Sequence, residues 1–135
     1  MKITVETQVS APISKVWQDY TSPEAITQWN AASADWHTTR ARVDLREGGH
    51  FSSRMEAKDG SMGFDFEGTY TKVVEHSLLE YTFGERTAQV EFIDGDSVTV
   101  RVSFDSEDSH SIEQQRDGWQ SILDSFKRYV ESVTA

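Results

Sequence analysis

Apolar and polar residues alternate through most of the chain. Ile3, Val5 and Val9 share one parity, which predicts a strand over residues 2–10. From 37 to 105 the alternation recurs in about six runs, separated by "REGG", "KDGS" and a second Asp-Gly pair at 94–95. Asp-Gly pairs favour tight hairpins, and hairpins join antiparallel neighbours. The pattern therefore predicts an antiparallel meander that, with the first strand, makes a curved sheet of about seven strands.

Two short helices are expected between the first strand and the meander. Pro12 suits the first position of a helix, and Val16 and Trp17 follow at helical spacing. The "SPE" at 22–24 predicts a second helix, with the serine hydroxyl as its cap and the acid near its positive end. Residues 30–36 have no period, so we expect a loop there.

The last 25 residues contain the strongest helical pattern. Ser111 with Gln114 predicts a capping box at the start of a helix over 111–134. Its apolar residues occupy an arc of roughly 120°, and they are Ile112, Trp119, Ile122, Leu123, Phe126, Tyr129, Val130 and Val133. Gln115 falls inside this stripe and Gly118 lies at its edge. Because an interior glycine costs about 1 kcal/mol relative to alanine, we expect Gly118 to permit either close backbone approach or room for a pocket.

These elements predict an α+β fold in a single domain over residues 1–135. The long helix must bury its stripe, and the only large surface available is a twisted, curved antiparallel sheet. A curved sheet gripped by one helix tends to leave a gap between the two. The expected architecture is therefore a sheet of about seven strands, two short helices and a long C-terminal helix.

Charge and composition narrow the class of protein. The formal net charge is −10, with 13 Lys and Arg against 23 Asp and Glu, so nucleic acid and anionic membrane surfaces are not expected partners. The absence of cysteine excludes disulfides, Cys-ligated zinc and thiol chemistry. No segment has the apolar length of a signal peptide or a membrane span. We expect a cytoplasmic protein, a monomer or weak homodimer, without membrane insertion.

The polar residues form no recognisable catalytic or metal motif. The four histidines lack the spacing of a metal site, and we expect no cofactor and no metal. His37 shares parity with Val43, so it is the one histidine that we place toward the inside of the sheet. Asp44, Asp65 and Glu67 are out of phase with their apolar neighbours, which predicts a solvated outer face.

Four segments carry a resemblance to a known family: "APISKVWQDYTSPEAITQWN", "VDLREGGHFSSRM", "FEGTYTKVVEHSLLEYTF" and "DGWQSILDSFKRYV". In these segments, which span nearly the whole chain, the sequence resembles the activator of heat-shock-protein ATPase homologue family, in its bacterial single-domain form. That family belongs to the START-like (SRPBCC, helix-grip) superfamily. The resemblance implies a helix-grip fold with a hydrophobic cavity between the sheet and the C-terminal helix. It also implies ligands such as lipids, sterols or polyketide-like aromatic molecules.

The aromatic residues are the best candidates for the wall of such a cavity. A pocket for an apolar ligand is lined mainly by hydrophobic side chains with a few polar groups. Tyrosine hydroxyls, Arg54 and Arg101 are weaker polar candidates than Gln115 and Ser53. The predicted ligand-binding residues are Trp29, Trp36, Phe51, Ser53, Met55, Phe64, Phe66, Tyr81, Phe92, Gln115, Trp119, Leu123 and Phe126.

Three functions are compatible with this pattern. The first is binding or carrying a small hydrophobic molecule, of aromatic, polyketide-like or lipid-like character. The second is an enzyme of the cyclase or hydrolase type, which would need an inward histidine or an arginine–carboxylate pair. The third is a co-chaperone-like interaction module with a protein partner, which would show an exposed apolar patch.

Overall fold

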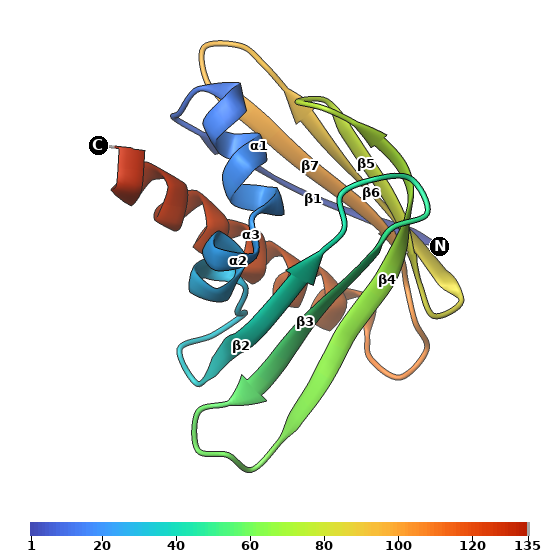
Figure 1. The fold of residues 1–135 in the computed structure, drawn as a ribbon. Helices are drawn as coiled ribbons and strands as arrows, with labels where there is room; N and C mark the ends of the chain where they lie inside the picture. The colour runs from blue at the N-terminus through green and yellow to red at the C-terminus, as the bar shows by residue number, and fades with distance from the viewer. Residues whose placement is uncertain (135) are drawn as a thin grey trace.

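The computed structural model describes residues 1–134, which form one seven-stranded sheet and three helices. All three helices lie on the same side of the sheet (Figure 1). This is the predicted α+β helix-grip fold. The strands are β1 (Lys2–Val9), β2 (Trp36–Val43), β3 (His50–Ala57), β4 (Gly63–Val74), β5 (Leu78–Phe83), β6 (Arg86–Ile93) and β7 (Val98–Asp105). The helices are α1 (Ile13–Thr21), α2 (Pro23–Trp29) and α3 (Ile112–Thr134).

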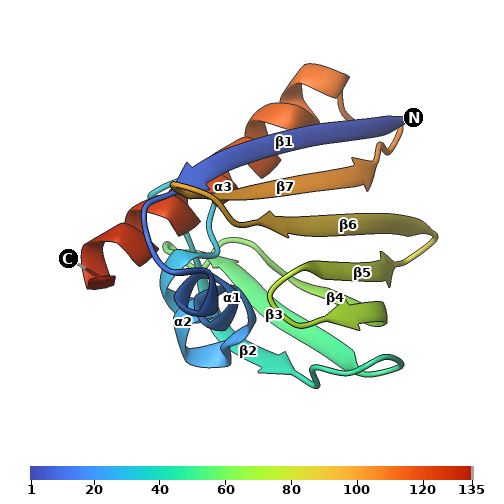
Figure 2. The same ribbon diagram turned by 90° about the horizontal axis from the view of Figure 1, so that it is seen from above.

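The sheet is antiparallel throughout, in the order β1-β7-β6-β5-β4-β3-β2. Strands β2 to β7 are therefore a meander, and β1 pairs with the last strand, opposing Val5 to Val102. Figure 2 shows the sheet curving around the side that carries the helices. Alternate residues of the strands point into this concave side, as the period-two pattern predicted, with interruptions in β2 after Thr38 and in β4 after Tyr70.

Helix α3 lies across the concave side with its apolar stripe toward the sheet. Leu123, Phe126 and Val130 are fully buried, whereas Trp119 is half-buried. The predicted capping box is present: the Gln114 amide N–H donates to Ser111 Oγ and the Ser111 N–H donates to Gln114 Oε1, both at 3.1 Å. Two of the donors left open by the first turn are thus satisfied.

The starts of the two short helices differ in detail from the prediction. Helix α1 begins at Ile13, so Pro12 is the residue before the first turn rather than its first member. Pro23 does occupy the first turn of α2, and Ser22 precedes it as expected. The Ser22 hydroxyl, however, donates to Glu24 Oε2 at 2.9 Å and accepts from no backbone N–H, so the predicted cap is not formed.

The close-approach explanation for Gly118 is wrong. A Cβ atom built at Gly118 would meet no atom within 4 Å outside the helix itself. Close packing does require a glycine at position 68 on β4, where a Cβ would collide with the Thr82 carbonyl oxygen and the Phe51 ring. Gly118 therefore costs helix propensity without a packing gain that the structure shows.

Candidate functional site

A hollow of about 450 Å³ lies on the concave side of the sheet, under the first half of α3. Residues from all three helices and from β2 to β7 face it, and most are aromatic or aliphatic. We call this hollow the inner pocket. Its lining residues are Tyr20, Ile26, Trp29, Asn30, Ala32, Trp36, Phe51, Ser53, Met55, Phe64, Phe66, Tyr70, Leu79, Tyr81, Arg86, Val102, Trp119, Ile122 and Leu123.

The structure brings most of the predicted ligand-binding residues together around this one hollow. The alternation places them on the correct face of each strand, and the helical stripe places three of them on α2 and α3. Their role in binding stays a prediction. The predicted residues that line the inner pocket are Trp29, Trp36, Phe51, Ser53, Met55, Phe64, Phe66, Tyr81, Trp119 and Leu123.

Three predicted residues do not line the pocket. Phe92 and Phe126 are packed in the core, where both rings contact Tyr20 at about 5 Å between centroids. Gln115 is buried, but its side chain turns toward the loop before α3: Oε1 accepts from the Glu107 N–H at 2.8 Å, and Nε2 donates to the Glu107 and His110 carbonyls. Gln115 therefore fixes the β7–α3 loop, and periodicity alone gave no sign of this partner.

The sequence prediction also missed residues that do line the pocket. They are Tyr20, Ile26, Asn30, Ala32, Tyr70, Leu79, Arg86, Val102 and Ile122. The alternation along the strands could have identified several of them. Tyr70 lies four residues after Phe66 on β4, and Arg86 lies two residues before Ala88 on β6, so each shares a strand face with an inward residue. The sequence analysis named Arg54 and Arg101, and not Arg86, as candidate arginines of the pocket. Both of those lie on the outer face, paired with Glu56 and Glu6.

Three of the residues that line the inner pocket are tyrosines, namely Tyr20, Tyr70 and Tyr81. Burial raises the pKa of Tyr70 to about 12, and it also raises the pKa values of Tyr20 and Tyr81 above the ordinary value of a phenol. All three phenols are therefore protonated at neutral pH, and each can donate one hydrogen bond. Tyr81 also interacts electrostatically with Tyr20, Tyr70 and Arg86, so these polar groups belong to one region of the wall.

Among the residues that the structure describes, Arg86 at the start of β6 is the only charged residue of the pocket wall. Its guanidinium carbon lies 4.4 Å from the centroid of the Phe83 ring, a cation–π geometry. Its Nη1 donates to the Asp105 carbonyl oxygen at 3.2 Å. Neither histidine nor a carboxylate is found among the pocket-lining residues of the described chain.

His37 does not face the inside of the sheet. The register of β2 against β3 shifts between Thr38 and Arg40, where one residue of β2 has no partner. Such a bulge reverses parity, so Thr38, opposite the buried Met55, is the inward residue. The enzyme hypothesis required an inward histidine, and His37 is not among the residues that line the inner pocket.

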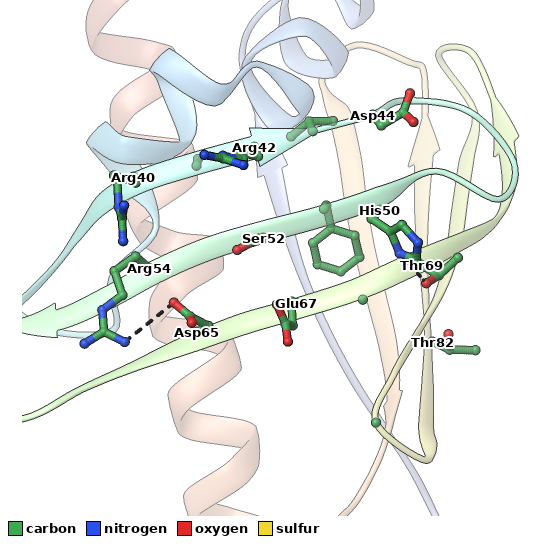
Figure 3. Close-up of a pocket in the computed structure, with 15 residues that line it drawn as sticks. Arg40, Arg42, Asp44, His50, Ser52, Arg54, Asp65, Glu67, Thr69 and Thr82 are labelled. Atoms are coloured by element: carbon green, nitrogen blue, oxygen red, sulfur yellow. Dashed lines mark hydrogen bonds and ion pairs between the residues drawn. The ribbon is translucent and has the colours of Figure 1, made fainter.

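A second hollow, of about 890 Å³, lies on the outer face over β2, β3 and β4 (Figure 3). Its labelled side chains are charged or polar, and Arg54 forms an ion pair with Asp65 at 3.5 Å. Asp65 and Glu67 are exposed here and Asp44 is exposed beside them, as the pattern predicted. Although it is the larger of the two, this polar surface does not suit an apolar ligand.

Residues 1–134 contain neither a cluster of metal-binding side chains nor a membrane-spanning helix. No group of three or more His, Asp or Glu side chains is placed to hold a metal ion. None of the helices in this part of the chain has the length and apolar character needed to cross a membrane.

Comparison with known proteins decides the family. The family described as "Activator of Hsp90 ATPase homolog 1-like protein" matches residues 10–131. The chain belongs to this family. Its members adopt the same START-like fold, which is a ligand-binding fold. No curated protein matches the chain.

Solved structures of AHSA1-like proteins support this membership. The solution structure of the AHSA1-like protein from Aeromonas hydrophila is 47% identical and has a TM-score of 0.93, covering 98% of this chain and 94% of that one. A solution structure from Cytophaga hutchinsonii is 46% identical, with a TM-score of 0.84 and coverage of 98% and 93%. A crystal structure from Nitrosomonas europaea, at 20% identity and a TM-score of 0.80, covers 98% of this chain and 96% of that one and shows the same fold.

Proposed function

We propose that this AHSA1-like protein binds or carries one small, largely apolar molecule in the inner pocket. The observation that carries the proposal is about 450 Å³ of space bounded mainly by aromatic and aliphatic side chains between the sheet and the helices. Pockets for small ligands commonly measure roughly 300–1,000 Å³ and have mostly apolar walls with a few polar groups. The inner pocket meets both criteria.

The size of the hollow argues against a simple packing defect. An apolar cavity of about 150 Å³ is already large enough to bind benzene. Protein interiors are close-packed, and unfilled volume among apolar side chains lowers the free energy of unfolding. A bound apolar molecule would recover the contacts that the pocket walls lack.

The wall suggests a ligand with a flat or extended apolar body. Trp36 and Phe64 form one aromatic pair of the wall, with ring centroids 5.9 Å apart, and Phe64 is 48% exposed. Trp119 adds a further ring to the wall and stacks on Phe104 at 4.0 Å. Aromatic walls of this kind favour aromatic or acyl groups, through offset and edge contacts with their rings.

Two neighbouring serines allow a matched test. Ser53 faces the inner pocket and is 6% exposed, whereas Ser52 is on the opposite face of the same strand. We expect the fluorescent dye N-phenyl-1-naphthylamine to bind the wild type, and Ser53→Phe to weaken binding at least about ten-fold by filling the pocket. Ser52→Phe adds the same ring to the outer face and should leave the dissociation constant unchanged.

Two outcomes would contradict binding in the inner pocket. If both bind the dye like the wild type, the dye does not occupy the inner pocket. If the wild type binds no dye and releases no small molecule on extraction, detected by mass spectrometry, the binding proposal is wrong.

A further inference from the structure

The inner pocket differs in charge from the rest of the molecule. The chain carries 23 Asp and Glu and a net charge of −10, yet none of these carboxylates lines the pocket. The single ionised side chain in its wall is the cation of Arg86. The pocket is thus a locally positive, mostly apolar space inside an acidic protein.

The charge of Arg86 is not neutralised within residues 1–134. The nearest acidic residue that it contacts is Asp105, but only through the backbone carbonyl. The Asp105 carboxylate is committed elsewhere: Oδ1 lies 3.0 Å from Lys2 Nζ, and Oδ2 accepts from the Thr87 N–H and hydroxyl at 2.8 and 2.9 Å. A guanidinium has five N–H donors, so most of those of Arg86 have no protein acceptor.

The tyrosine hydroxyls are also without acceptors. Tyr70 is 6% and Tyr81 8% exposed, and neither these two nor Tyr20 forms a side-chain hydrogen bond to the described residues. Within that part of the chain, Asp19 Oδ2 is the one fully enclosed side-chain atom that lacks a partner. The phenol oxygens are therefore not enclosed by protein atoms, and the pocket is the space that they face. Three O–H donors and a guanidinium share this wall.

On the premise of the proposed function, we propose that the ligand is an amphipathic monocarboxylate. Its apolar body lies among Trp36, Phe66 and Leu123, and its carboxylate accepts hydrogen bonds from Arg86 and Tyr81. Arg86 is half-buried, and a charge that is partly withdrawn from water is stabilised by an opposite charge and by hydrogen bonds. A carboxylate supplies both the opposite charge and the acceptors that this wall lacks.

Charge balance favours a monoanion over a phosphate. One guanidinium neutralises one negative charge, whereas a phosphate dianion would leave an uncompensated charge in an apolar pocket. Arginine also matches the planar, two-oxygen geometry of a carboxylate. The tyrosines add donors without adding charge.

A matched pair of ligands tests the inference. 2-Naphthylacetate and 2-(2-naphthyl)ethanol share the same ring and nearly the same size, and they differ in the carboxylate. By isothermal titration calorimetry at pH 7, we expect the wild type to bind the acid at least about ten-fold more tightly than the alcohol, since hydrogen bonds to charged groups are the stronger ones.

Substitutions then assign this preference to named groups. Arg86→Gln should weaken acid binding by about ten-fold and alcohol binding much less, which removes the preference, and Arg86→Lys should restore part of it. Tyr81→Phe removes one oxygen without changing shape, and should weaken acid binding by about five- to ten-fold. Arg101→Gln deletes an equal charge on the outer face, where Arg101 pairs with Glu6, and should change neither affinity.

The outcomes separate this inference from the proposed function. Equal affinities for acid and alcohol in the wild type would overturn the carboxylate inference while leaving apolar binding intact. A preference that survives both Arg86→Gln and Tyr81→Phe would overturn it too. If neither ligand binds, the inner pocket is not a binding site and both proposals fall.

Discussion

The two halves of α3 carry the same apolar stripe but meet different surroundings. In the second half, Phe126 and Val130 are 0% exposed and pack under α1, α2 and β1. In the first half, Trp119 and Ile122 are only half-buried and face the inner pocket. A single amphipathic helix thus closes the core at one end and leaves a hollow at the other.

The difference comes from what lies opposite the helix. Tyr20 and Trp29, from the two short helices, fill the space against Phe126, with ring centroids 5.1 and 4.9 Å away. No helix is inserted between the first half of α3 and β3 to β5 (Figure 2), so only side chains reach into that space. Residues on a fully packed helix face stabilise the fold, whereas those facing the hollow remain available for a ligand.

Truncation in the second, fully packed half of α3, which we call the filled half, should have the largest effect on stability. Phe126→Ala removes a fully buried ring from an aromatic cluster, and we expect a loss of ~3–5 kcal/mol in the free energy of unfolding, measured with urea. Dye affinity under native conditions should not change, because Phe126 is not in the pocket wall. A loss below about 1 kcal/mol would contradict the filled half as we describe it.

Truncation in the first half of α3, which faces the inner pocket, should lower stability less and weaken ligand binding more. Trp119 stacks on Phe104 with an interplanar angle of 10°, but it also lines the inner pocket and is only half-buried. For Trp119→Ala we expect a loss of about 2–3 kcal/mol, below the usual range for a packed tryptophan. Dye binding should weaken markedly in the same titration. If binding is intact, this end of α3 does not form the pocket wall.

Gly118 lies beside Trp119 and should respond in the opposite direction. Gly118→Ala adds a methyl group into open space, so only helix propensity changes, and we expect a gain of up to about 1 kcal/mol. Dye affinity should be unaffected, because Gly118 does not line the pocket. Destabilisation in the same urea titration would show that the helix lies closer to its neighbours than the structure has it.

The smallest expected effect concerns stability in acid and depends on Asp105, the last residue of β7. Hydrogen bonds from Lys2 and Thr87 lower the pKa of Asp105 from 3.8 to about 2, joining the ends of β1, β6 and β7. Because the pKa is lower in the folded state, this stabilisation is present above about pH 4 and is lost as the pH falls toward 2. The side chain is 32% exposed, so solvent screening keeps the effect modest. Asp105→Asn should flatten the pH dependence of the melting temperature in that window, and an unchanged profile would contradict the shifted pKa.

Much of the fold follows from short-range patterns in the sequence. The alternation along β5 and β7 and the Asp-Gly turn at 59–60 define strands and their order, and the stripe on 111–134 defines the helix that covers them. These signals are local, because a period of two or 3.6 residues specifies a face.

The details of the site depend on distances between elements, which a hydrophobic pattern along the sequence does not determine. Phe126 and Leu123 share one stripe, yet only Leu123 reaches the pocket, because the short helices fill the space beside Phe126. The bulge after Thr38 reverses parity and turns His37 outward. Gln115 has the parity of a pocket residue, but its partners are backbone groups of a loop. Each of these outcomes is set by tertiary contacts rather than by the pattern.

The four tryptophans allow the most direct test of the inner pocket. Trp29, Trp36 and Trp119 line it, while Trp17 packs against Phe92 and His76 outside it. In a ¹H–¹⁵N NMR titration with 2-(2-naphthyl)ethanol, we predict that the indole N–H signals of the first three shift and that of Trp17 does not. Shifts confined to Trp17, to the backbone amides of the outer face, or to no residue at all would contradict binding in the inner pocket.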